Sequence, residues 1–182
     1  NTKNPRYSYA SSKILGEVLT YNYLRNDIKK IIFRPHNIYG PSMGFEHVIP
    51  QIIRKIIKNT KKLNVKECKI KIQGNGLESR SFCFIEDAAV GIILSANKGK
   101  NKEIYNTGNQ DEITIRNVIL KISKILGIKI KIESGKLQMG SALRRVPDNG
   151  KLKKLGYKSI YNLENGLIKT VNWYKNYYLK ND

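Results

Sequence analysis

Tyr9 and Lys13 are the side chains in this sequence whose types and spacing suggest acid–base chemistry. Of the 11 tyrosines, Tyr9 alone has a lysine four residues after it, and on a helix two such side chains project from one face, one turn apart. Holding a tyrosine as its phenolate near neutral pH requires about 4 kcal/mol, and a positive charge ~4 Å away supplies about 4 kcal/mol at an effective dielectric of ~20. The pair could therefore transfer a proton; the alternative is an ordinary solvated pair.

The histidines and cysteines make a weaker case. His36 and His47 lie eleven residues apart with no cysteine close to either, so we expect that neither binds a metal ion. Cys68 and Cys83 form neither a Cys-x-x-Cys pair nor a dense disulfide framework. Because Cys83 stands between two phenylalanines, we interpret it as a core or strand residue and not as a nucleophile.

The elements that must position these residues alternate between helix and strand. Apolar residues at helical spacing predict a helix over 9–26, and the β-rich run 30–34, ended by Pro35, predicts a buried strand that leads into a loop at 36–44. Further helices are expected over 48–58, 88–96, 114–126 and 162–179, and further strands over 70–72, 81–85, 103–105 and 128–132. Glu86 and Asp87 are expected at the positive end of their helix, and Gly127 is expected to end another helix in the left-handed conformation. This alternation predicts an α/β fold.

Composition describes a globular and strongly basic chain. It has 182 residues, 40% of them hydrophobic, with 34 Lys and Arg against 14 Asp and Glu, which gives a net charge of +20. The apolar content is too high for a disordered basic tail. The longest apolar run, 88–94, is far shorter than the ~18 residues of a membrane span. Since no signal peptide or disulfide framework is visible either, we expect no membrane partner and a cytoplasmic location.

The positive charge raises nucleic acid as a partner, but its distribution argues otherwise. Lysines recur almost everywhere, and the densest stretch follows isoleucines at helical spacing, which is typical of the solvated face of an amphipathic helix. The basic residues of that stretch are Arg54, Lys55, Lys58, Lys61 and Lys62. No helix-turn-helix, zinc-finger or RNA-binding signature accompanies them. We therefore expect no nucleic acid and a smaller anionic partner.

Five motifs, in order, cover nearly the whole chain. They are Tyr9-Ala-Ser-Ser-Lys13, Arg34-Pro-His-Asn-Ile-Tyr-Gly-Pro41, Arg80-Ser-Phe-Cys-Phe-Ile-Glu-Asp87, Tyr105-Asn-Thr-Gly108, and Arg145-Val-Pro-Asp148 with Lys153-Lys-Leu-Gly-Tyr157 behind it. Together they resemble the extended short-chain dehydrogenase/reductase family, in its branch of nucleotide-sugar epimerases and dehydratases. The resemblance implies the C-terminal part of a Rossmann-like NAD-binding domain, residues 1–42 and 82–108, plus a smaller α/β substrate-binding domain, residues 43–81 and 109–182.

The resemblance also implies roles at the reacting end of the site. Tyr9 and Lys13 would be the catalytic residues: Tyr9 would take a proton from a sugar hydroxyl, while Lys13 would favour the phenolate and bind the cofactor ribose. Pro35 and His36 would edge the nicotinamide pocket, at the carboxyl end of a strand where α/β sheets bind ligands. The implied cofactor is NAD, with NADP as the alternative.

Four more residues are implied to bind a nucleotide-diphosphate sugar. Asn37 would reach toward the diphosphate, Arg80 and Arg145 would grip it with the guanidinium fork, and Asp148 would bind a ribose hydroxyl. Each has a plainer alternative: Asn37 could only shape a turn, Arg80 could be a surface arginine, and Arg144 could take the place of Arg145.

The sequence departs from the family in one important respect. Nothing in it resembles the opening Gly-x-x-Gly-x-x-Gly fingerprint that brings a backbone close to the cofactor pyrophosphate. We therefore expect a fragment that does not bind the cofactor well alone. An epimerase is favoured, with a 4,6-dehydratase, a keto-sugar reductase and a non-catalytic remnant as alternatives. A homodimer along the helix of Tyr9 is implied by the resemblance.

Overall fold

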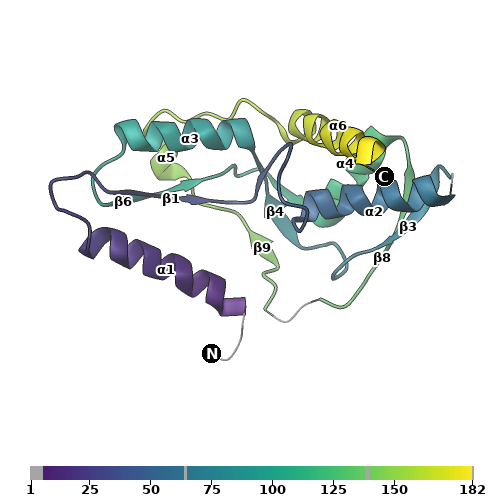
Figure 1. Cartoon of the computed structure of the whole chain (residues 1–182), viewed down its shortest axis with the longest axis horizontal. Coiled ribbons are helices and arrows are strands. Elements are labelled where there is room, and N and C mark those ends of the chain that lie inside the picture. Colours follow the sequence, from purple (N-terminus) through teal and green to yellow (C-terminus); the bar gives the residue numbers. More distant parts are fainter. Residues whose placement is uncertain (1–5, 64, 138–139, 182) are drawn as a thin grey trace.

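The computed structural model describes residues 6–63, 65–137 and 140–181 (Figure 1). Its elements in chain order are α1 (Arg6–Asn22), β1 (Ile31–Pro35), β2 (Ile38–Tyr39), α2 (Val48–Leu63), β3 (Glu67–Lys71), β4 (Ser79–Ser81), β5 (Cys83–Phe84), α3 (Ile85–Lys98), β6 (Glu103–Thr107), β7 (Glu112–Thr114), α4 (Ile115–Leu126), β8 (Lys129–Glu133), β9 (Arg144–Arg145), α5 (Gly150–Lys154) and α6 (Leu163–Asn181). Parallel pairs β1–β6, β2–β5 and β3–β8 confirm the α/β class.

The lobe drawn on the left of Figure 1 is built on the parallel pair β1–β6, with α3 and α5 on one side and α1 on the other. In the described part of the chain β6 is the only strand that pairs with β1. The predicted strand is present, but it is not buried as expected: Phe33 is 44% exposed. The reason is that β1 has a neighbour along one edge alone and that the apolar residues of α1 do not cover it.

Helix α1 is attached to this lobe mainly by polar contacts. Its apolar residues Ile14, Leu15, Val18 and Leu19 are all exposed. Lys30, only 3% exposed, instead caps the end of the helix: its Nζ donates to the carbonyls of Tyr21 at 3.2 Å and Leu24 at 2.6 Å. An ammonium at this end also interacts favourably with the helix dipole. The helix was predicted over 9–26, but it spans Arg6–Asn22, so it begins earlier and ends four residues before the predicted end.

The lobe drawn on the right holds the main hydrophobic core. Helix α2 places isoleucines at positions i, i+3, i+4 and i+7, and these side chains are buried against α4, α6 and β3. Helix α4 has the predicted ends, since Thr114 Oγ1 accepts the N–H of Asn117 and Gly127 has a φ of 68°. On the solvent side of α2, Arg54, Lys55 and Lys58 are exposed, as the amphipathic interpretation expects.

The outer edge of β3 is covered by side chains of α2. Lys55 Nζ donates to the carbonyl of Lys71 at 2.9 Å, and Asn59 Nδ2 donates to the carbonyl of Lys69 at 3.2 Å. The backbone groups of Lys66 and Ile72 bond to β8 on the other edge. Because successive residues of a strand alternate in direction, the two carbonyls bound by α2 face away from β8.

A buried carboxylate connects α3 to the segment that leads into α6. Asp87 lies in the first turn of α3, as predicted, and is 1% exposed. Its Oδ1 accepts the N–H of Ile160 at 2.8 Å, and its Oδ2 accepts the Ser159 hydroxyl at 2.8 Å and the N–H of Tyr161 at 3.0 Å. Asp87 is therefore a structural anchor as well as a helix-dipole partner.

Four short elements were not predicted: β2, which lies within the expected loop 36–44, and β7, β9 and α5. The predicted strand 81–85 is also divided, into β4 and β5, and α3 begins already at Ile85. Strand β4 lies between β7, which is antiparallel to it, and β9, which is parallel. Strands this short are fixed by their pairing partners and leave little periodicity in the sequence.

Candidate functional site

Tyr9 and Lys13 lie on the open side of α1. Tyr9 is 72% exposed, and the Lys13 ammonium lies over its ring, 5.2 Å from the ring centre. A cation over a tyrosine ring is attracted by the ring's electrons. The two side chains thus lie next to each other, as predicted, with the Lys13 ammonium over the face of the Tyr9 ring.

The two residues line a cleft of about 940 Å³ between α1 and β1, which we call the Tyr9 cleft. Its lining includes Tyr9, Lys13, Gly16, Thr20, Phe33, Pro35 and His36. The small residue Gly16 has no atom within 4 Å of the place where a Cβ would stand, so the floor of the cleft beside α1 is open. The structure therefore brings four of the predicted site residues, Tyr9, Lys13, Pro35 and His36, to one cleft.

An ion pair that the sequence argument missed joins the two walls of this cleft. Arg34 donates to both oxygens of Glu17, at 2.8 and 2.6 Å. Hydrogen bonding from the guanidinium holds the pKa of Glu17 below its usual value, and the carboxylate raises the pKa of Arg34. Glu17 lies four residues after Lys13 on the same helical face, and this spacing was the signal available in the sequence.

His36 and Asn37 follow β1 directly. The N–H of His36 donates to the carbonyl of Thr107, at 2.9 Å, and extends the β1–β6 pairing. Asn37 has a φ of 45°, and its Nδ2 donates to the carbonyl of Ser81 at 2.9 Å. Its amide therefore holds the turn between β1 and β2 against β4, so Asn37 shapes a turn in this structure.

Arg80 and Arg145 are brought together by strand pairing, since they are register partners in the parallel pair β4–β9. Arg80 Nη2 donates to the carbonyl of Ala142 at 2.8 Å. Burial lowers the pKa of Arg80 first, and the positive charge of Arg145 lowers it further. Two cations in register, one of them partly desolvated, favour an anion between them.

Contacts with neighbouring residues distinguish Arg144 from Arg145. Arg144 donates to both oxygens of Glu112, at 3.0 Å each, and is thereby neutralised. Asp148 Oδ1 accepts the N–H of Gly150 at 2.8 Å, at the start of the short helix α5. Asp148 is thus placed three residues after Arg145, with its carboxylate engaged by the backbone.

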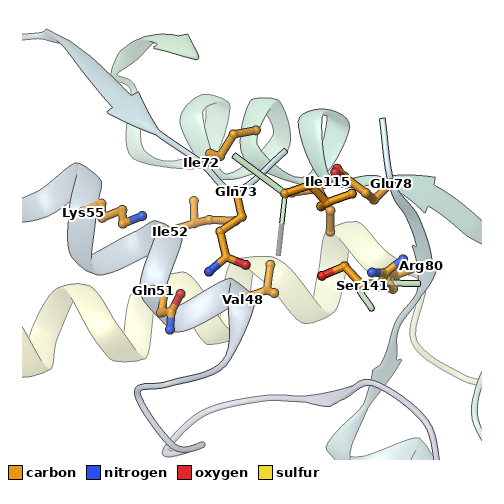
Figure 2. Close-up of a pocket in the computed structure, with 11 residues that line it drawn as sticks. Val48, Gln51, Ile52, Lys55, Ile72, Gln73, Glu78, Arg80, Ile115 and Ser141 are labelled. Carbon is orange, nitrogen blue, oxygen red and sulfur yellow. The ribbon is translucent and has the colours of Figure 1, made fainter. Parts of the chain in front are cut away.

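A separate hollow of about 150 Å³ lies beside Arg80, and we call it the Arg80 hollow (Figure 2). Its lining consists of Val48, Gln51, Ile52, Lys55, Ile72, Gln73, Glu78, Arg80, Ile115, Leu137 and Ser141. Figure 2 shows Glu78 and Arg80 on one side of it and the amide-bearing Gln51 and Gln73 on the other. Apolar walls with a few polar groups are typical of small-molecule sites. Sequence reasoning had identified only Arg80 among these residues.

The described residues contain no cluster of His, Cys, Asp and Glu suited to a metal ion. Within the same part of the chain, no helix is both long and apolar enough to cross a membrane. Cys83 is fully buried on β5 beside the Tyr157 hydroxyl, and burial raises its pKa to about 11. This confirms its interpretation as a core residue.

A model of the family described as "NAD dependent epimerase/dehydratase family" matches residues 1–108, more than half of the chain. The chain belongs to this family. The match includes the Tyr9 cleft and Arg80, whereas Arg145 and Asp148 lie beyond it.

Curated relatives of this epimerase/dehydratase chain differ in activity. A probable GDP-L-fucose synthase 1 of Oryza sativa subsp. japonica is 28% identical over 171 residues, which cover 91% of the chain and 51% of the relative. A dTDP-D-glucose 4,6-dehydratase of Mus musculus is 31% identical over 185 residues, covering 95% and 49%. The chain therefore spans about half the length of these relatives.

Solved structures agree with the family. A UDP-glucuronic acid 4-epimerase from Bacillus cereus, in complex with UDP-glucuronic acid and NAD, matches with a TM-score of 0.81 and 25% identity. The match covers 93% of this chain and 53% of the epimerase.

Proposed function

We propose that this chain carries the acid–base residues and the substrate-diphosphate residues of an NAD(P)-dependent nucleotide-sugar epimerase. The observation that carries the proposal is that Tyr9 and Lys13 line one cleft with Pro35 and His36, at the carboxyl end of the parallel strand β1. Parallel α/β sheets bind their ligands at this end.

In this proposal the Tyr9 phenolate accepts the proton of a sugar hydroxyl when the carbon is oxidised to a ketone, and it returns the proton to that oxygen when hydride is delivered to the opposite face of the ketone. The Lys13 ammonium, which lies over the Tyr9 ring, would donate a hydrogen bond to the cofactor ribose. When bound, the nicotinamide ring supplies the acceptor for the hydride that leaves the same carbon. Tyr9 thus balances each redox step with one proton.

The substrate diphosphate is assigned to Arg80 and Arg145, whose register pairing places two cations side by side. An anion there offsets both the burial of Arg80 and the repulsion between the two charges. Asn37 and Asp148 are assigned to the diphosphate and to a ribose hydroxyl, respectively. Asn37 Nδ2 has a second hydrogen besides the one that it donates to Ser81, and this hydrogen can be donated to a phosphate oxygen. Asp148 has a second carboxylate oxygen that can accept a ribose hydroxyl.

The residues present fit one end of the cofactor. The volume of the Tyr9 cleft, about 940 Å³, lies near the upper end of the range for small-molecule sites, and Lys13 and Gly16 supply a donor and an open approach. The glycine-rich fingerprint for the pyrophosphate is absent from the sequence. We therefore propose that cofactor binding requires a further segment or chain. The cofactor could be either form, since similar solved structures include complexes with NAD and with NADPH.

A 4,6-dehydratase is the second candidate, because the mouse relative has that name. The two activities differ in how the sugar exchanges hydrogen with solvent. Elimination of water removes a carbon-bound hydrogen as a proton, whereas epimerisation by hydride return does not. In deuterated water a dehydratase therefore labels its product on carbon, and an epimerase leaves the carbons unlabelled.

The test joins this chain to the N-terminal half of the Bacillus cereus epimerase and supplies nucleotide sugars with NAD or NADP. We expect an epimer with unlabelled carbons, normal turnover in Tyr7→Phe, and loss of turnover in Tyr9→Phe with unchanged unfolding. Tyr7 is the matched control because it is an exposed tyrosine of the same helix. Normal turnover in Tyr9→Phe would refute the mechanism, and a folded but inactive fusion would support a non-catalytic remnant.

A homodimer through α1 is proposed as well, because four apolar side chains of this helix are exposed. Sedimentation of the fusion and of a Leu15→Lys variant tests it. A dimer that survives the substitution would contradict this interface.

A further inference from the structure

We propose that the Arg80 hollow receives the base of the substrate nucleotide and that Glu78 selects guanine there. This inference rests on the proposed function, in which Arg80 and Arg145 hold the diphosphate. It adds the identity of the nucleotide, which neither the family nor the relatives determine.

Glu78 is a largely buried carboxylate whose nearby positive charge is Arg80, the pKa of which its own charge raises. Its side chain lines the hollow, and the residue is only 7% exposed. Over the ranges that the structure describes, no hydrogen bond or ion pair engages its two oxygens. A carboxylate in such a position is costly unless hydrogen-bond donors face it. A ligand that brings hydrogen-bond donors into the hollow would meet this carboxylate there.

The backbone around Glu78 is arranged to admit this side chain. Gly74 has a φ of 69°, and a Cβ built there would lie 1.8 Å from Glu78 Oε1. Any other residue at position 74 would displace the carboxylate, so the glycine is needed both for the turn and for the place that Glu78 occupies.

Glu78 directly precedes β4 and is two residues before Arg80; in extended backbone two such residues project toward the same side, with their Cα atoms about 7 Å apart. Both line the hollow, as Figure 2 shows. A nucleotide whose phosphates contact Arg80 can therefore reach Glu78 with its base, with the ribose spanning the distance between them.

The hollow has the shape and surface of a base-binding site. Its volume of about 150 Å³ equals the space of about five water molecules, enough for one flat heterocycle. Ile52, Ile72 and Ile115 supply apolar walls, and the amides of Gln51 and Gln73 supply both donors and acceptors at the rim. These amides can pair with ring carbonyls and nitrogens of any base, so they do not decide between bases.

The carboxylate of Glu78, in contrast, distinguishes guanine from the other bases. Guanine presents two adjacent donors, its ring N1–H and its 2-amino group, and the two oxygens of Glu78 can accept both in a bidentate arrangement. Uracil and thymine present one ring N–H between two carbonyls, which would face the carboxylate and be repelled. Adenine and cytosine have a single amino group beside a ring nitrogen that accepts hydrogen bonds, so at most one good bond forms.

Calorimetric titration of the 182-residue chain with GDP, UDP and dTDP tests the proposal. These three ligands have the same diphosphate charge, so the general attraction of a +20 chain for anions cancels in the comparison. We expect GDP to bind about ten-fold more tightly than the other two. Glu78→Gln should abolish this preference, because an amide presents one donor where an acceptor was. Glu133→Gln, which removes an exposed carboxylate of β8 outside the hollow, should leave it unchanged.

Two results would overturn the inference: equal binding of GDP and UDP by the unmodified chain, which does not depend on any variant folding, or an unchanged preference in Glu78→Gln. Arg80→Ala separates this inference from the function on which it rests. If Arg80→Ala weakens all three nucleotides and the unmodified chain does not discriminate between them, the diphosphate site stands and the guanine assignment falls. If no nucleotide binds, both fall.

Discussion

Replacing Asp87 by asparagine tests the anchor between α3 and the segment that precedes α6. The three hydrogen bonds to the carboxylate lie between 2.8 and 3.0 Å, and Asp87 is 1% exposed. Asparagine keeps one oxygen. In its best orientation that oxygen faces Ser159 and Tyr161, which leaves the new NH₂ group against the N–H of Ile160, so two donors oppose each other.

The expected loss follows from these contacts. A hydrogen bond to a charged group contributes about 1.5–3 kcal/mol, and the buried N–H that is left without an acceptor costs about 1–3 kcal/mol. We therefore expect Asp87→Asn to lower the free energy of unfolding by about 3 kcal/mol, a large share of the ~5–15 kcal/mol typical of a domain. A carboxylate that acted only through the helix dipole would contribute about 0.3–1 kcal/mol.

Urea unfolding followed by the fluorescence of Trp173, the single tryptophan, measures the difference. Glu86→Gln is the matched control, because Glu86 is the preceding residue and its pair with Lys169 is solvent-exposed. The reasoning is refuted if Asp87→Asn destabilises the chain by less than about 1 kcal/mol or by no more than Glu86→Gln does.

Three further predictions concern α1 and the core. Lys30→Met should speed amide hydrogen exchange in the last turn of α1 more than Lys29→Met, because Lys30 caps that turn from a buried position; equal exchange in both would contradict the capping role. The lowered pKa of Glu17 means that its pair with Arg34 stabilises the attachment of α1 above the ordinary carboxyl pKa of about 4.3, and that this contribution is lost as pH falls through the lowered value. An NMR titration should therefore find a lower midpoint for Glu17 in the unmodified chain than in Arg34→Ala, and identical midpoints would exclude the coupling. Cys83, with its pKa raised to about 11 by burial, should react with iodoacetamide at pH 8 only after unfolding; mass spectrometry that finds the native thiol alkylated at the unfolded rate would refute this.

Helices and the longer strands could be predicted because their patterns are local. A few neighbouring residues suffice to predict each of these elements. Examples are the isoleucine spacing of α2, the threonine and glycine at the two ends of α4, and the apolar run of β1. The pairing of β4 with β9 could not be predicted, since Arg80 and Arg145 are 65 residues apart in the sequence. Their proximity follows from the tertiary fold.

The residues of the candidate site also fall into those that the sequence could predict and those that it could not. Tyr9 and Lys13 could be found from their spacing, and Pro35 and His36 from their place at the end of a strand. Glu78 could not be found, because its burial and its place in the hollow beside Arg80 both depend on the segments that pack around it. Asp87 was expected at the start of its helix, but the donors that it binds come from more than 70 residues later.

The contacts that α2 makes with β3 also influence how this chain behaves at high concentration. An unpaired strand edge is a template on which a second molecule can add a strand and begin a fibre. Here Lys55 and Asn59 already occupy two of the carbonyls on that edge, so an incoming strand would first have to displace them. Polymerisation through β3 is thereby disfavoured without a proline or a bulge in the strand.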